Sequence, residues 1–233
     1  MKEIKKIYSF CRNNLDLNDA KLPDEYFYAS LPLCIIDSVF SIGVHYNSTK
    51  NTVSKYCDYF SLQKTRKDNG RFPEIPEQEN IDEFIRKIEL IGIEKFSEDV
   101  LKNRQRTSTR NGILKTEATL EFSKILSEYE INYFQDVKKI YSNESFETKI
   151  RNIPGQKSGI SLQYFFMLAG DENLIKPDRM IIRFLERTLN RKISNDDSQN
   201  ILLETCELLK EKYPSMNPRI LDNLIWRYER GRI

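Results

Sequence analysis

Apolar residues recur every three to four positions along most of the chain, which is the spacing of one buried helix face. The segment 125–140 and the segment 197–213 both follow this pattern, and we expect a helix over each. Alternation with a period of two residues, which is typical of strands, is scarce. The pattern therefore predicts an all-α fold of roughly ten helices.

Polar and proline residues mark where several helices begin and end. Ser194, followed by two aspartates, predicts a helix start, and Pro214 predicts its end. Pro218 suits the first turn of a last helix that continues to the C-terminus. The clearest loop is 67–80, which contains two prolines. A strongly apolar helix is expected over 31–44.

Composition limits the class of protein. The chain has 233 residues, 39% apolar and 31% charged, which is typical of a soluble protein with one large domain or two small lobes. The net charge is only +2, so any nucleic-acid site must be a local patch. The apolar runs are too short to span a bilayer, and no apolar leader follows Met1. We therefore expect a cytoplasmic protein without a membrane partner.

Cysteine and histidine usage excludes several kinds of site. Four cysteines are widely spaced, which excludes a CxxC zinc or redox site and a compact iron–sulfur cluster. We expect them to be reduced and mostly buried. His45 is the only histidine, so a histidine-based metal site or a Ser-His-Asp triad is nearly excluded. No metal and no cofactor is expected.

A proline-glycine turn joins two short helical segments near residue 155. The first, 147–153, is ended by Pro154, because the residue before a proline avoids the helical region. Gly155 can adopt positive φ, and the next helix is expected to begin near residue 158 or 159. Successive N–H groups at a helix N-terminus favour a phosphate, and Lys157 adds a positive charge there.

This segment resembles the helix-hairpin-helix motif of the DNA glycosylases of the endonuclease III superfamily. Their hairpin reads roughly L-P-G-hydrophobic-G-x-x-x-A, and the chain here reads IPGQKSGIS from Ile153. The family then has an aspartate in a V-D-x-x-x-x-R context, and the chain reads KPDRMIIR from Lys176. Gly159 and Asp178 are 19 residues apart, as in the family. The resemblance covers about 147–233 and is looser upstream, where 37–56 is similar to the early barrel helices.

The resemblance implies a monofunctional DNA glycosylase that acts as a monomer on double-stranded DNA containing a damaged or modified base. The catalytic residue would be Asp178, whose carboxylate would stabilise an oxocarbenium-like state and orient water. The base would be flipped into a pocket. Gly159 stands where bifunctional members carry a Schiff-base lysine, so no lyase chemistry is expected. The hairpin residues implied to hold the DNA backbone are Gly155, Gln156, Lys157, Ser158 and Gly159.

The same resemblance implies two helical lobes with a cleft between them. One lobe would combine 1–40 with 169–233, and the other would be a helical barrel over 41–168 that contains the hairpin. The basic stretch 102–115, with Arg106 and Arg110, would contact DNA, or it is a solvated loop. His45 and Tyr46 would belong to the base pocket, or they are a packing pair.

Each motif also has an ordinary structural explanation. PGQKSG is a common joint between helices, and an aspartate at a helix start is most often a cap. The fold can also serve a non-catalytic DNA-binding protein, and a helical protein-interaction module is a third interpretation. The excised base stays open among alkylated purines, uracil or thymine mismatches, oxidised guanine and hypermodified bases.

Overall fold

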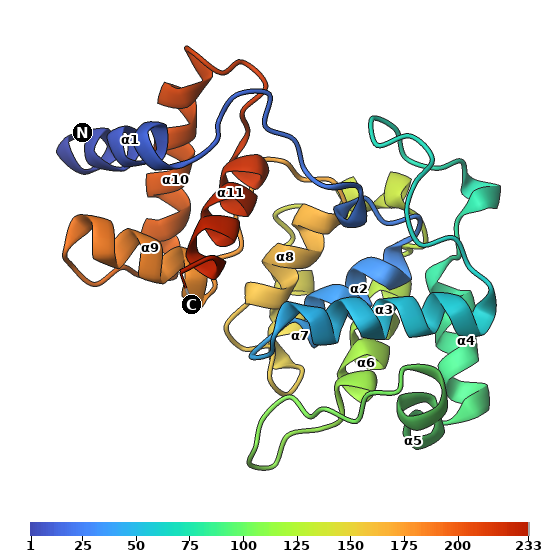
Figure 1. The fold of residues 1–233 in the computed structure, drawn as a ribbon. Helices are drawn as coiled ribbons and strands as arrows, with labels where there is room; N and C mark the ends of the chain where they lie inside the picture. Colours follow the sequence, from blue (N-terminus) through green and yellow to red (C-terminus); the bar gives the residue numbers. More distant parts are fainter. Residues whose placement is uncertain (233) are drawn as a thin grey trace. The chain divides into compact units, whose positions relative to one another are not determined.

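The computed structural model describes residues 1–232 and is helical throughout (Figure 1). Strand-like pairing in the described part of the chain is limited to two isolated bridges, between Tyr28 and Thr65 and between Arg106 and Leu114. The predicted all-α class is therefore confirmed. The chain forms two compact units, one of Met1–Pro23 with Gly170–Ile233 and one of Asp24–Ala169.

The terminal unit contains helices from both ends of the chain. These are α1 (Lys2–Asn14), α9 (Arg179–Leu189), α10 (Asn195–Lys210) and α11 (Pro218–Arg230). Helix α1, blue in Figure 1, packs on the orange helices α9 and α10, and α11 packs on α9. Their apolar faces form one core that includes Ile7, Cys11, Ile181, Phe184, Leu202 and Leu221.

Capping residues set the helix starts in the terminal unit. The Ser194 side chain accepts a hydrogen bond from the Asp197 N–H at 3.1 Å, which confirms the predicted start of α10. Pro218 lies in the first turn of α11, where Asn217 caps the Ile220 N–H at 2.8 Å. Helix α10 ends at Lys210, four residues before the proline that was expected to stop it, because residues 211–212 already form a turn.

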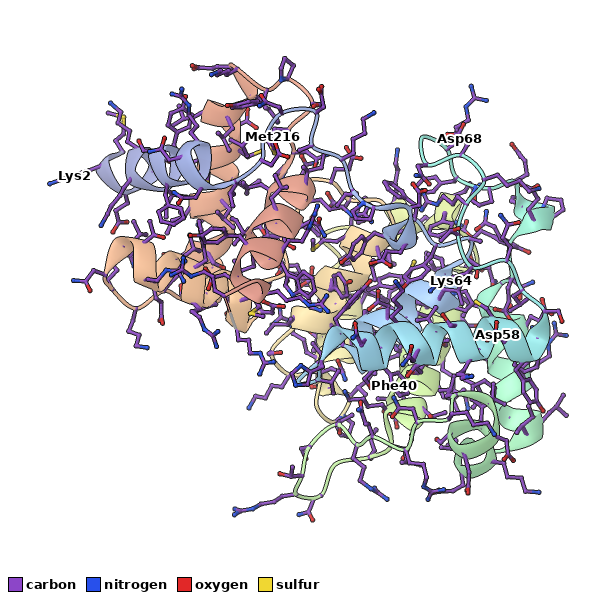
Figure 2. The ribbon with its side chains drawn as sticks, viewed as in Figure 1. Lys2, Phe40, Asp58, Lys64, Asp68 and Met216 are labelled. Atoms are coloured by element: carbon purple, nitrogen blue, oxygen red, sulfur yellow. The ribbon has the colours of Figure 1, made fainter. Side chains whose placement is uncertain are left out.

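The central unit is built around α2. Its main helices are α2 (Leu31–Phe40), α3 (Tyr46–Phe60), α4 (Ile81–Ile91), α6 (Lys115–Glu128), α7 (Glu144–Asn152) and α8 (Ile160–Leu168). Shorter turns are η1 (Asp24–Tyr26), η2 (Ile75–Glu77), α5 (Ile93–Lys95), η3 (Phe96–Val100) and η4 (Phe134–Ile140). Every residue of α2 is buried, and the helix packs against α3, α6 and α8. Phe40 at its end and Asp58 near the end of α3 are labelled in Figure 2.

The burial of α2 explains why residues 24–40 belong to the central unit. The family resemblance implies that 1–40 join the terminal lobe, whereas the structure groups 24–40 with the central unit. A helix that is apolar on every side must be covered on every side, and the central helices provide that cover. The helix also ends at Phe40, short of the expected residue 44.

The predicted continuous helix over 125–140 is wrong. Helix α6 ends at Glu128, and Glu130 adopts a left-handed φ of 56°. The chain then resumes as the 3-10 helix η4, which buries Phe134, Val137 and Ile140. A three-residue repeat fits a 3-10 helix as well as an α-helix, so the apolar spacing continues across the break.

Two further expectations concern the loop and the thiols. The loop 67–80 is confirmed, with η2 as its only helical turn within the described residues. Arg66, just before it, lies 4.6 Å from the ring centre of Phe72 and 4.5 Å from that of Phe134. All four cysteines are buried and none of them forms a disulfide. Among residues 1–232, no helix combines the length and the apolar character that a membrane span requires.

Candidate functional site

Two helices joined by a seven-residue turn, α7 and α8, occupy the segment in which the hairpin was predicted. Asn143 caps α7 through the Phe146 N–H at 3.0 Å, and Ile153 beyond its end is buried. Two backbone hydrogen bonds close the turn: Gln156 N–H donates to Ile153 O, and Gly159 N–H donates to Gln156 O, both at 2.9 Å. The turn therefore has a defined conformation immediately before the N-terminus of α8.

Both turn glycines have positive φ, 88° at Gly155 and 74° at Gly159. A Cβ on Gly155 would lie 2.4 Å from Cβ of Thr107, which belongs to the basic stretch. A Cβ on Gly159 would lie 2.7 Å from Cζ of Arg151. Glycine suits both positions because the backbone is left-handed, and at Gly155 also because Thr107 occupies the space of a Cβ.

Three residues of the turn carry N–H groups without an acceptor in the described part of the chain. Those of Gly155, Lys157 and Ser158 donate no hydrogen bond to any described residue, and all three residues are exposed. The exposed Lys157 side chain and the Arg151 guanidinium beside Gly159 add positive charge. Free amides, a helix N-terminus and two cations together can bind an anion such as a phosphate.

Gln156 has a different role from the one expected. Its residue is 2% exposed, and its side-chain oxygen accepts a hydrogen bond from the Ser161 hydroxyl. The side chain therefore joins the turn to the first turn of α8 and is directed into the protein. Gln156 can act on a ligand only by shaping the turn.

The basic stretch 102–115 divides into bound and available cations. Arg104 pairs with Glu94 at 2.7 Å and with Glu98 at 3.0 Å. Lys115 is buried, and its ammonium donates to Phe40 O at 2.9 Å and to Ile42 O at 2.8 Å. Lys115 therefore stabilises the end of α2, whereas the exposed pairs of Arg104 mainly neutralise its charge. Their contacts explain why the stretch has fewer available charges than its sequence suggests.

Arg106 and Arg110 are exposed on the same loop. Arg106 donates to Gly112 O at 2.8 Å, and the loop is closed by Thr107 N–H donating to Ile113 O at 2.9 Å. The contact between Thr107 and Gly155 joins this loop to the turn between α7 and α8. The structure thus brings together two predicted DNA-binding segments that are separated by about forty residues of sequence.

Asp178 lies in the terminal unit as the N-cap of α9. Its Oδ1 accepts hydrogen bonds from the Met180 N–H at 2.7 Å and the Ile181 N–H at 3.3 Å. No described residue donates a hydrogen bond to Oδ2, and the residue is partly exposed. The carboxylate is held at one oxygen by the positive end of the helix, while the other oxygen is available for a ligand.

A second carboxyl group, Asp222 on α11, lies beside Asp178. It is 8% exposed and accepts a hydrogen bond from the Lys176 N–H at 2.9 Å. Burial raises the pKa of Asp222 to about 8, and the charge of Asp178 adds to this effect. Asp222 is not among the residues predicted from the sequence. An acid on the buried face of an amphipathic helix was the available signal, since Leu221, Leu224 and Ile225 surround it along the chain.

The predicted base-pocket residues differ in exposure. His45 is exposed at the N-cap position of α3, and its side chain makes no capping hydrogen bond. Tyr46 stacks on Tyr26 with ring centres 5.9 Å apart, and its hydroxyl donates to Glu25 at 3.3 Å. Burial, followed by the neighbouring Tyr26, raises the pKa of Tyr46. The environments of the two residues therefore differ: His45 is exposed, whereas Tyr46 packs on Tyr26.

A buried acid on α2 is also absent from the predicted residues. Asp37 is fully buried and accepts hydrogen bonds from the hydroxyls of Tyr28 at 2.9 Å and Tyr164 at 3.2 Å. Burial and the charge of Asp37 raise the pKa of both tyrosines. The contacts connect the segment before α2 with α8, next to the hairpin. One aspartate within LPLCIIDSVF was the signal in the sequence.

The central unit also has two surface hollows. A groove of about 730 Å³ is lined by residues that include Asp82, Arg86 and Lys124, and a smaller one of about 250 Å³ by residues that include Arg66, Arg71 and Phe72. Neither contains a residue of the α7–α8 turn or of the basic stretch.

Within residues 1–232, no group of three or more histidine, cysteine, aspartate or glutamate side chains is arranged to hold a metal ion.

Comparison with curated proteins and with solved structures finds no match. A family profile, in contrast, covers nearly the whole chain, from residue 5 to residue 230. That span includes the turn between α7 and α8, the basic stretch, Asp178 and Asp222. The chain belongs to the family described as Domain of unknown function (DUF8548).

Proposed function

We propose that the protein is a monofunctional DNA glycosylase, which hydrolyses the N-glycosidic bond of a flipped, damaged or modified base and leaves an abasic site. The observation that carries the proposal is the hairpin turn, where the free N–H groups of Gly155, Lys157 and Ser158 precede α8 beside two cations. This is the arrangement that the resemblance to helix-hairpin-helix glycosylases leads one to expect for a phosphate of double-stranded DNA.

In this proposal the hairpin binds the DNA backbone and carries no sequence information. Lys157 stands in place of the second hairpin glycine and adds a charge to the amide cradle. Arg106 and Arg110, on the loop that packs against Gly155, extend the contact to a neighbouring phosphate. A contact of this kind is local, as a net charge of only +2 requires.

Asp178 would supply the chemistry. Cleavage of an N-glycosidic bond passes through an oxocarbenium-like state, and a carboxylate near the sugar stabilises that positive charge. The two amides of α9 hold Oδ1, which leaves Oδ2 to face the sugar or the attacking water. Glycine at position 159 removes the amine that would form an imine, so the product would be an abasic site in an unbroken strand.

The proposal is tested by abasic-site formation. The purified protein is incubated with duplexes that each carry one alkylated, deaminated, oxidised or hypermodified base, and the DNA is then treated with hot alkali. Strand breaks at one base with the wild-type protein support the proposal and identify the base. A panel without breaks, with DNA binding intact, supports the second candidate.

That second candidate is a DNA-binding protein of the same fold without catalysis. It is favoured by one specific observation: Asp178 has a complete structural role as a helix cap, and this role does not require chemistry. Both candidates predict DNA affinity that falls steeply with salt. A helical protein-interaction module predicts no DNA affinity at any salt concentration, so binding measured from low to physiological ionic strength separates it from both.

A further inference from the structure

The segment before α9 is held by a side chain from α11. The N–H of Lys176 donates to Oδ1 of Asp222 at 2.9 Å. The carbonyl of the same residue accepts the Asp178 N–H at 2.6 Å. Both polar groups of the Lys176 backbone are therefore bonded, one to Asp222 and one to Asp178. A carboxyl group on α11 thus determines the path of the chain two residues before the cap of α9.

The Asp178 side chain depends on that path. Its Oδ1 reaches the Met180 and Ile181 amides only if the backbone enters α9 in an extended conformation, and φ and ψ of Asp178 are −84° and 178°. Pro177 between the two bonded residues has a restricted φ and is itself buried. The orientation of the carboxylate therefore depends on how firmly residues 176–178 are held.

We propose that Asp222 is a positioning residue for Asp178: its carboxyl group binds the Lys176 backbone and so fixes the segment that places the Asp178 carboxylate at the start of α9. This inference rests on the proposed function, in which Asp178 is the catalytic carboxylate. Asp222 itself touches no substrate, because it is 8% exposed and acts through the backbone.

Protonation of Asp222 allows its carboxyl group to lie beside the carboxylate of Asp178. Its pKa is raised to about 8 by burial and by the charge of Asp178, while Lys176 and Arg219 lower it in part. Burial therefore favours the neutral form of Asp222 at neutral pH. A protonated carboxyl group keeps an oxygen that accepts the Lys176 N–H. Above about pH 8 the second charge would repel the Asp178 carboxylate from the helix amides.

The test compares Asp222→Asn with Asp222→Leu. Asparagine keeps an oxygen acceptor and is always neutral, whereas leucine has a similar volume and no acceptor. Amide hydrogen exchange at Lys176, Met180 and Ile181 is the first measurement, and it needs no substrate. We expect at least tenfold faster exchange at these amides in the leucine protein and wild-type exchange in the asparagine protein. Glu204→Gln, an exposed acid on α10, is the matched control.

The second measurement is the rate of base excision against pH. The wild-type rate should fall as the pH rises through about 8, the asparagine protein should lack this fall, and the leucine protein should be slow at every pH. Unchanged exchange in the leucine protein would overturn the inference, and so would an alkaline fall that persists in the asparagine protein. If no base is excised by the wild type, the proposed function fails, and the exchange data alone still decide whether Asp222 holds the segment.

Discussion

Thr107 packs directly against Gly155: a Cβ on the glycine would lie 2.4 Å from the threonine Cβ. One residue belongs to the basic loop and the other to the turn between α7 and α8, so this contact fixes two positively charged segments against each other. It also explains why the turn requires glycine at this position in addition to its φ of 88°. The contact is the physical basis for treating the loop and the turn as one surface.

Gly155→Ala should lower the free energy of unfolding by about 2–4 kcal/mol, from backbone strain together with the collision with Thr107. Gly43→Ala is the matched control, because Gly43 also has positive φ but has no atom within 4 Å of its Cβ position, so about 1 kcal/mol is expected. Urea denaturation of both proteins measures the difference. Equal losses of stability would show that the contact with Thr107 has no energetic effect.

Lys157→Ala and Arg110→Ala should each weaken DNA binding at physiological salt. Each should also lower the slope of log affinity against log salt by about 0.9 for every phosphate that the variant no longer neutralises. Arg104→Ala should have a smaller effect, because Arg104 is already paired with two glutamates. Fluorescence anisotropy with one duplex at several salt concentrations provides the slopes. Equal changes of slope in the Lys157 and Arg104 variants would contradict the assignment of the turn as a phosphate site.

Lys115→Met should destabilise the protein by about 2–4 kcal/mol without a specific effect on DNA affinity. The buried ammonium binds two carbonyl groups at the end of α2, and its removal leaves those carbonyls without a donor. Lys124→Met is the control, since Lys124 forms an exposed pair with Glu89 that contributes little. Thermal and chemical denaturation measure stability, and the DNA titration is repeated on the folded variant.

The buried Asp222 predicts a pH dependence of stability. Its folded pKa of about 8 is above the value of about 3.9 in an unfolded chain, so its contribution is fully present below about pH 4 and is lost as the pH rises to about 8. Between these values the free energy of unfolding of the wild type should fall steadily with pH, because the folded state binds the proton more tightly than the unfolded state. Asp222→Asn should remove that component, as measured by urea unfolding at several pH values between these limits. Parallel curves for the two proteins would contradict the assignment.

Local signals predicted the parts of the fold that depend on neighbouring residues. The caps at Ser194 and Asp178, the proline at the start of α11 and the glycine turn after α7 all act within a few residues, and the structure contains each of them. The break after Glu128 could not be predicted in this way, because apolar spacing continues through the 3-10 helix that follows.

The rest of the candidate site depends on contacts with residues outside each local motif. Arg104 of the basic stretch is paired with Glu94 and Glu98, and Lys115 binds the end of α2. These partners lie outside the stretch, so its sequence alone does not show which of its cations can bind a ligand. Asp37 and Asp222 are single acids in amphipathic or apolar helices. Their importance comes from hydroxyl and amide groups that only the folded chain brings to them.

The most direct test of the central claim is the excision rate of Asp178→Asn on the base that the wild type removes. Asparagine caps a helix as well as aspartate does, so this substitution keeps the structural role and removes only the charge. We expect the wild type to yield strand breaks only after alkali, and the variant to be slower by about 10²–10³-fold, with DNA affinity retained and the free energy of unfolding changed by no more than about 1 kcal/mol. An Asp178→Asn protein that excises the base at the wild-type rate would contradict the assignment of Asp178 as the catalytic carboxylate.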